Sequence, residues 1–170
     1  MTERLFYREA ALEAIARKVI KEYDPSLLAG EPVPIPIEEM IEKQFHLSLE
    51  YQILRKSGHI LGITVFEDDY VPVYDTDAIQ YTLLFFPKGT IIIDESLLHD
   101  INEGRLRFTC AHELAHWILH LEFYTESGNM AAMQPDARKS IDANKMLEWQ
   151  ADRLASELLM PTGMVKKAFY

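Results

Sequence analysis

Hydrophobic residues recur at a helical spacing near the start of the chain. Over residues 7–23 they return every three to four positions with Arg, Lys and Glu between them, a pattern that predicts an amphipathic helix. The helix should end at Pro25, since proline cannot continue it. The proline-rich segment 32–36 should be extended, and residues 37–45 resume the helical spacing in a predicted short helix.

Over the middle of the chain the period changes to that of strands. Residues 47–53 alternate apolar and polar side chains, Ser57 and Gly58 predict a turn, and residues 90–94 form a β-branched run. The other strand-like runs are residues 61–66, 71–74 and 81–86. We predict an α+β fold class: a small, mainly antiparallel sheet of about three to five strands, packed with helices.

The rest of the chain returns to helical spacing. We predict helices over residues 105–121 and 145–159, the second of them ended by a proline. The polar connection between them, residues 122–144, is longer than most loops, and loops of that length are often functional or mobile. The length fits one domain spanning residues 1–170. A new amphipathic segment begins just before Tyr170, which suggests a truncated longer protein.

Net charge and composition exclude several classes of function. The 170 residues carry a net charge of −10, which argues against a direct nucleic-acid surface, because a polyanion requires clustered Lys and Arg. The single cysteine excludes an internal disulfide. There is no signal peptide, and no run approaches the roughly 18 apolar residues of a membrane span. We expect a soluble, cytoplasmic protein whose partners are neither membranes nor nucleic acids.

The candidate chemistry lies in His112-Glu113-Leu114-Ala115-His116, an HExxH pattern. Histidines four positions apart lie one turn apart on a helix face, so both imidazoles can bind one zinc ion. The glutamate after the first histidine can then take a proton from zinc-bound water. Five residues can match by chance, so the surrounding helix has to support the interpretation.

The helix around this motif is apolar on most of its circumference. At about 100° per residue, a stripe roughly 100° wide holds the ionisable residues His112, Glu113, His116 and His120. A stripe that merely faced solvent would hold Lys, Glu and Gln more naturally than three histidines, and a buried ionisable stripe needs a partner such as a metal ion. Cys110 lies on the apolar arc, so we interpret it as a buried structural thiol and not as a redox switch.

Zinc requires a third protein ligand, for which Glu148 is the best candidate. A histidine six positions beyond His116 would extend the motif, but Glu122 stands there and Leu119 replaces the expected glycine. Glu148 and Asp152 lie four residues apart at the border of an apolar helix face, where like charges repel. With a cation present, Glu148 would bind zinc and Asp152 would accept the outer N–H of a zinc-bound histidine. The simpler alternative is a surface carboxylate pair.

The chain resembles the ImmA/IrrE metallopeptidases. The resemblance extends from about Pro32 to Pro161 and rests on three segments, GTIIID (89–94), RFTCAHELAHWILH (107–120) and EWQADRLASELLMP (148–161). It implies a zincin-like active-site helix and a thermolysin-like zinc site with Glu113 as general base and the ligands His112, His116 and Glu148. It also implies a bacterial or phage-related regulator that cleaves a helix-turn-helix repressor encoded beside it.

Some roles and functions stay open at this point. An oxyanion donor is expected, and the candidates are His120 and Tyr124; the alternative for His120 is a hydrogen-bonded residue at a helix end. The leading function is a zinc endopeptidase that relieves repression. The alternative is an anti-repressor module that sequesters its partner without proteolysis. A purely structural zinc site is the third interpretation, but it gives Glu113 no use.

Overall fold

A computed structural model of the chain describes residues 6–55, 60–126 and 141–170. The α+β fold class is confirmed. The helices are α1 (Glu9–Tyr23), α2 (Ile37–Glu39), α3 (Glu103–Glu126), α4 (Ile141–Leu159) and α5 (Thr162–Phe169), with single turns at Pro25–Leu28, Met40–Gln44 and Glu95–His99. The strands are β1 (Ser48–Gln52), β2 (Gly62–Val65), β3 (Asp69–Asp75), β4 (Gln80–Phe86) and β5 (Thr90–Asp94). The predicted turn at Ser57 and Gly58 lies outside the described residues.

The strands form two small sheets. One has the order β1-β5-β2, with β1 parallel and β2 antiparallel to β5, and the other is the antiparallel hairpin β3–β4. Two of the three strand pairings are therefore antiparallel, in line with the mainly antiparallel sheet that was predicted. The parallel pairing joins β1 to β5 across three intervening strands, and no turn signal in the sequence marks so distant a partner.

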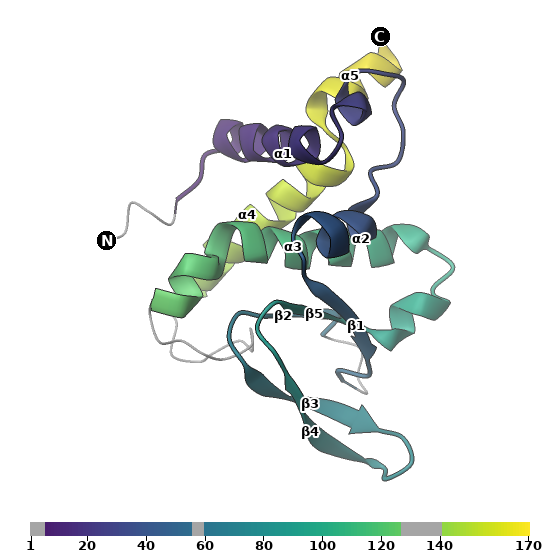
Figure 1. Cartoon of the computed structure of the whole chain (residues 1–170), viewed down its shortest axis with the longest axis vertical. Helices are drawn as coiled ribbons and strands as arrows, with labels where there is room; N and C mark the ends of the chain where they lie inside the picture. Colours follow the sequence, from purple (N-terminus) through teal and green to yellow (C-terminus); the bar gives the residue numbers. More distant parts are fainter. Residues whose placement is uncertain (1–5, 56–59, 127–140) are drawn as a thin grey trace.

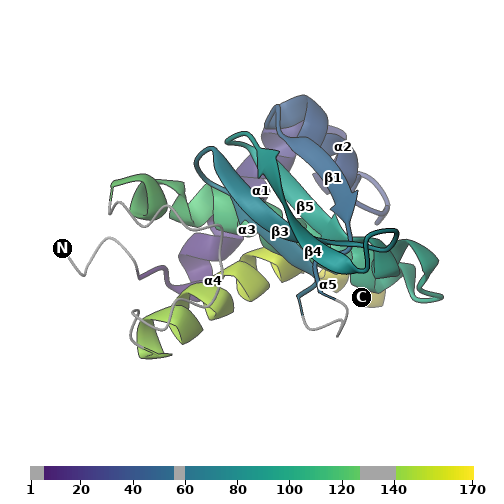
Figure 2. The ribbon, with the colours of Figure 1, turned by 90° about the horizontal axis from the view of Figure 1, so that it is seen from below.

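The helices and the hairpin cover opposite faces of the three-stranded sheet (Figure 1). Successive side chains of β2 alternate between these faces. Thr64 contacts Glu113 of α3, whereas Ile63 and Val65 join the apolar cluster under the hairpin. Figure 2, the view from below, places the hairpin in front of the sheet and the helices behind it.

The two larger apolar clusters lie between these layers. The larger cluster lies between the helices and the sheet and includes Leu12, Ile20, Ile91, Ile93, Leu114 and Leu154. The smaller one, between the sheet and the hairpin, includes Ile63, Val65, Val71, Val73, Phe86 and Ile92. All five residues of β5 are buried, which explains why this strand has three consecutive isoleucines in place of an alternating pattern.

The helices that carry the candidate motifs are longer than predicted. α3 was expected to end at Leu121 but continues to Glu126, because Tyr124 is buried and its ring stacks on Phe66. α4 begins at Ile141, four positions before its predicted start. Residues 127–140 of the predicted connection lie outside the described residues. No helix within the described ranges is both long and apolar enough to cross a membrane.

Candidate metal centre

α3 and α4 pack against each other and bring the two C-terminal motifs together. Small side chains allow their backbones to approach closely. Ala111 and Ala115 of α3 and Ala151 and Ala155 of α4 are all buried in the larger core. The polar border of each helix therefore faces the other along one side of this contact.

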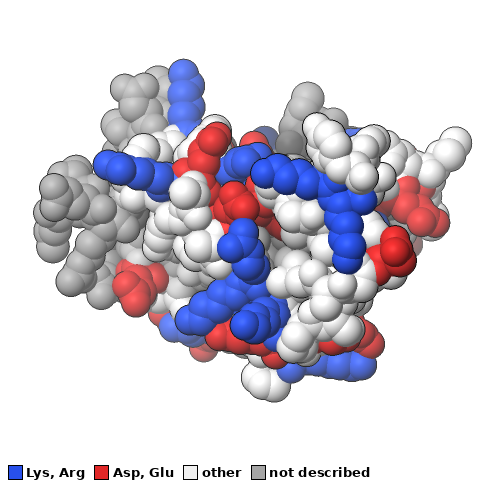
Figure 3. Space-filling model, turned by 90° about the horizontal axis from the view of Figure 1, so that it is seen from above, with Lys and Arg blue, Asp and Glu red and all other residues white. Residues whose placement is uncertain are grey.

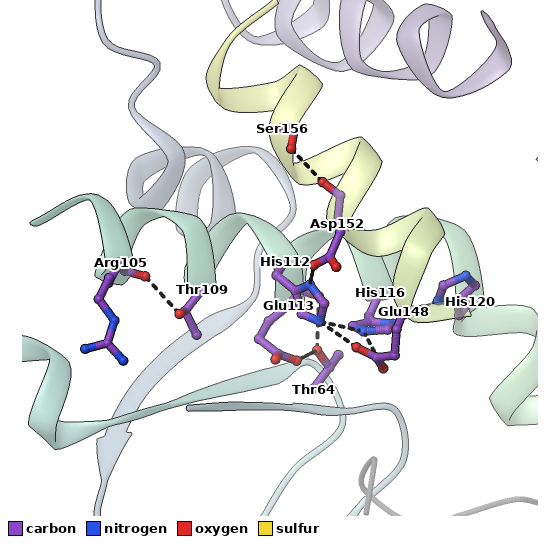
Figure 4. A network of polar contacts seen from close by, with 10 residues as sticks. All are labelled: Thr64, Arg105, Thr109, His112, Glu113, His116, His120, Glu148, Asp152 and Ser156. Atoms are coloured by element: carbon purple, nitrogen blue, oxygen red, sulfur yellow. Dashed lines mark hydrogen bonds and ion pairs between the residues drawn. The ribbon is translucent and has the colours of Figure 1, made fainter. Parts of the chain in front are cut away.

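Three side chains converge at this border (Figure 4). His112 and His116 lie one turn apart on α3, with their Nε2 atoms 3.0 Å from each other. Glu148 of α4 reaches them with both carboxylate oxygens, Oε2 at 3.1 Å from His112 Nε2 and Oε1 at 3.3 Å from His116 Nε2. His116 is 1% exposed, while the Glu148 side chain is 47% exposed, so the group opens to solvent on one side.

The donor set and its spacing fit a zinc ion. Two imidazole nitrogens and a carboxylate oxygen are the ligands of many catalytic zinc sites, which keep a fourth position for water or substrate. The three candidate ligand atoms all lie within 4.8 Å of one another. Two nitrogens bound tetrahedrally at 2.0–2.1 Å stand roughly 3.3 Å apart, close to the 3.0 Å between the histidines. His112, His116 and Glu148 therefore form a zincin-like ligand group.

Electrostatics hold the Glu148 carboxylate in the charged form that a metal requires. Burial opposes its ionisation, but hydrogen bonds from His112 and His116 outweigh that effect and lower the pKa of Glu148. Burial also opposes charge on His112, yet the nearby carboxylates, Glu148 foremost, raise its pKa to about 9. A cation bound between these groups would replace that proton, since metal ligands must be deprotonated.

Each histidine has a polar partner on the side away from this group. His112 Nδ1 lies 2.8 Å from Oδ1 of Asp152, the residue predicted to accept its outer N–H. His116 Nδ1 lies 2.9 Å from Nδ1 of His120, whose Nε2 is 3.1 Å from Oε1 of Gln150. His120 is 0% exposed. His120 is therefore hydrogen-bonded, as one of its two interpretations expected, but it lies well inside α3 and not at the helix end that was predicted.

Glu113 points to the sheet side of α3. Its carboxylate accepts a 2.7 Å hydrogen bond from the Thr64 hydroxyl of β2, and that hydroxyl also lies 3.0 Å from the Glu113 carbonyl. Glu113 is 5% exposed. The neighbouring residue of β2 on the same face is Gly62, where an added Cβ would lie 2.6 Å from Glu113 Oε1. Only a glycine leaves this space to the carboxylate.

The remaining predicted residues lie in the core. Tyr124 is 2% exposed and stacks on Phe66 with ring centroids 4.5 Å apart, and burial raises its pKa. Cys110 is fully buried, as predicted, and burial raises the pKa of its thiol to about 12. Sequence reasoning missed Thr64, Gly62 and Gln150. Only the glycine within a strand could have signalled a close approach.

Comparison with known proteins agrees with this geometry. Residues 60–170 match the model of peptidase family M78, described as the IrrE N-terminal-like domain. The matched region contains β2 with Thr64, all of α3 and all of α4, and so every side chain of the metal centre. No curated protein matches the chain.

Proposed function

Because the chain belongs to the ImmA/IrrE family of metallopeptidases, we propose that it is a zinc endopeptidase that cleaves a specific helix-turn-helix repressor and so relieves repression. The observation that carries the proposal is the convergence of His112, His116 and Glu148 beside the buried carboxylate of Glu113. A structural zinc site has no use for that carboxylate. The charge of −10 supports a protein and not DNA as the macromolecule that is bound.

In this proposal, His112, His116 and Glu148 hold the metal. Bound zinc supplies Lewis-acid chemistry: it lowers the pKa of water and polarises the scissile carbonyl. Glu113 takes a proton from the attacking water and delivers it to the leaving nitrogen of the peptide. The Thr64 hydroxyl fixes one carboxylate oxygen of Glu113, so the base keeps one orientation while it accepts and returns the proton.

The polar partners of the histidines position them. His112 uses Nε2 toward the metal group, so its Nδ1–H can donate to Asp152. His116 likewise directs Nε2 to the group and its Nδ1–H toward His120. We assign His120 to this positioning role, because both of its ring nitrogens already face protein partners. Tyr124, buried and stacked on Phe66, is not part of the proposed chemistry.

The test is cleavage of the repressor encoded by the adjacent gene. The protein is incubated with zinc and that repressor, and a discrete pair of fragments is expected on a gel and by mass spectrometry. Glu113→Gln keeps the shape of the side chain and removes the base. We expect the rate to fall about a hundred- to ten-thousandfold, the usual contribution of general acid–base catalysis.

Glu122→Gln provides the matched control, since Glu122 lies on the same helix but is exposed. It should cleave at the normal rate. If the Glu113→Gln protein inactivates the repressor to the same extent as the wild-type protein and no fragments form, the function is sequestration and not proteolysis.

A further inference from the structure

The outward face of the β3–β4 hairpin is apolar along its whole length. In this antiparallel register three cross-strand pairs share that face: Tyr70 with Phe85, Pro72 with Leu83, and Tyr74 with Tyr81. On the opposite face, Val71, Val73 and Phe86 are buried in the cluster against the three-stranded sheet. We call the six outward residues the hairpin face.

Large side chains of the hairpin face are exposed to solvent. Tyr70 is 61% exposed, Leu83 64% and Phe85 53%. Their rings are arranged in pairs: Tyr70 and Phe85 meet edge to face at a centroid distance of 5.5 Å, and Tyr74 and Tyr81 at 5.2 Å. Contiguous exposed apolar patches on soluble proteins mark interaction sites, and aromatic residues are enriched at the centre of such interfaces.

Acidic residues border both ends of this face. Between Phe66 and Thr90 the chain has five carboxylates and one lysine, a net charge of −4. Glu67, Asp68 and Asp69 precede or begin β3, whereas Asp75 and Asp77 lie at the turn into β4. The lysine, Lys88, forms an ion pair with Glu67 at 2.9 Å.

Most basic side chains lie outside the hairpin, where they are mixed with acidic ones. Figure 3 shows Lys and Arg side chains interleaved with Asp and Glu on the face that carries α1 and α5, which lies at the end of the molecule opposite the hairpin (Figure 1). α1 balances its three basic residues with three glutamates, whereas α5 contains Lys166 and Lys167 and no acidic residue. The net charge of −4 on the hairpin segment, residues 67–89, favours the approach of a basic partner to this end of the molecule.

We propose that the hairpin face is a docking surface for a folded protein whose own surface has an apolar patch bordered by Lys and Arg. The inference rests on the proposed function in one respect: it names the repressor as that partner, because a DNA-binding protein carries clustered Lys and Arg. A second copy of this chain is the poorer occupant. Two copies, each with a charge of −10, would bring their acidic borders together.

Docking here would be separate from the metal centre. The hairpin packs on the sheet face opposite to the one that Thr64 and α3 occupy. A repressor held by the hairpin face would have a high local concentration at the metal centre without relying on the few residues around its scissile bond. Docking on the hairpin face would thereby allow the protease to select a single substrate protein.

The test uses Glu113→Gln as a background that binds but does not cut. In it, Leu83→Thr and Phe85→Thr are combined, because threonine keeps strand propensity while removing apolar surface. The Kd for the adjacent-gene repressor, measured by titration calorimetry, should rise about tenfold or more, as for a central interface residue. Leu98→Thr is the matched control. Leu98 is 46% exposed but lies outside the hairpin face, so this variant should bind the repressor with an unchanged Kd.

Two further experiments test the role of the acidic residues of the hairpin and the integrity of the fold in the docking variants. Asp75→Asn with Asp77→Asn should slow association and weaken its salt dependence. With Glu113 intact, the Leu83 and Phe85 variants should cleave a short peptide spanning the repressor's scissile bond at the normal rate, which shows that the fold and the metal centre are preserved.

Three results would overturn the inference. In the first, the combined Leu83→Thr and Phe85→Thr substitutions leave the Kd for the repressor unchanged. In the second, the wild-type protein is a dimer and the same substitutions dissociate it. In the third, the Glu113→Gln protein does not bind the repressor. Failure of the proposed function looks different: the repressor is bound through the hairpin face, but no Glu113-dependent fragment forms.

Discussion

His120 links a metal-facing histidine to the interior of the molecule. If Nε2 of His116 faces the metal, its proton is on Nδ1 and is donated to Nδ1 of His120, 2.9 Å away. The proton of His120 is then on Nε2 and is donated to Oε1 of Gln150. Burial, the largest effect, lowers the pKa of His120 to about 4, so the ring stays neutral and can accept that bond. The chain of donors fixes both tautomers.

Loss of this bond should weaken zinc binding. We expect His120→Leu to raise the zinc Kd about ten- to a hundredfold, the usual cost of losing a hydrogen bond to a metal-binding histidine. His120→Asn, which keeps an acceptor near the position of Nδ1, should recover part of the affinity. The measurement is competition with a chelator at pH 7.5.

The same variants distinguish positioning from packing. A residue that only fills the core would lower the melting temperature of the metal-free protein and leave the zinc Kd unchanged, and that outcome would contradict the assigned role. His99→Asn replaces an exposed histidine outside the site and should alter neither quantity.

At the scale of elements, β2 shapes the wall beside Glu113. Gly62 and Thr64 occupy successive positions on the face of β2 toward α3, one leaving space and the other donating a hydrogen bond. Thr64→Val removes the hydroxyl and keeps the volume. We expect kcat to fall about ten- to a hundredfold, which corresponds to a hydrogen bond of about 1.5–3 kcal/mol to a charged group.

Zinc affinity should be unchanged by this substitution, because Thr64 contacts none of the three ligands in the described hydrogen bonds. Thr64→Ser should restore kcat, and Thr82→Val on the hairpin is the matched control. Gly62→Ala should also lower kcat, since its Cβ would push the Glu113 carboxylate aside. A normal kcat for the Thr64→Val protein would contradict the role of Thr64 in positioning Glu113.

The sequence predicted elements better than it predicted their partners. The apolar arc of α3 and the run of β5 follow from local periodicity, and the like charges of Glu148 and Asp152 pointed to a cation. By contrast, Thr64 and Glu113 are separated by 49 positions, and nothing near either residue marks the other. The end of α3 was misjudged because Glu122 looked like the start of a loop, although Tyr124 is buried two positions later.

At the scale of the whole molecule, the metal centre joins two helices that belong to different parts of the fold. α3 carries the histidines and lies on the sheet, while α4 carries Glu148 and packs against α1. A bound ion would therefore connect α3, which lies on the sheet, to α4, which packs against α1. Ligands that bind only the folded state stabilise it by an amount set by their concentration and Kd.

Zinc should therefore raise the melting temperature of the protein. At a free concentration about 100 times its Kd, the ion adds about 2.7 kcal/mol to the free energy of unfolding. For a chain of this length that corresponds to roughly 5–10 °C. Calorimetry of chelator-treated protein with and without added zinc measures the shift. Glu148→Gln should lose most of the shift on adding zinc, measured from its own metal-free melting temperature, which the loss of the contacts with His112 and His116 lowers. Equal melting temperatures for the unchanged protein with and without zinc would contradict a metal that ties α3 to α4.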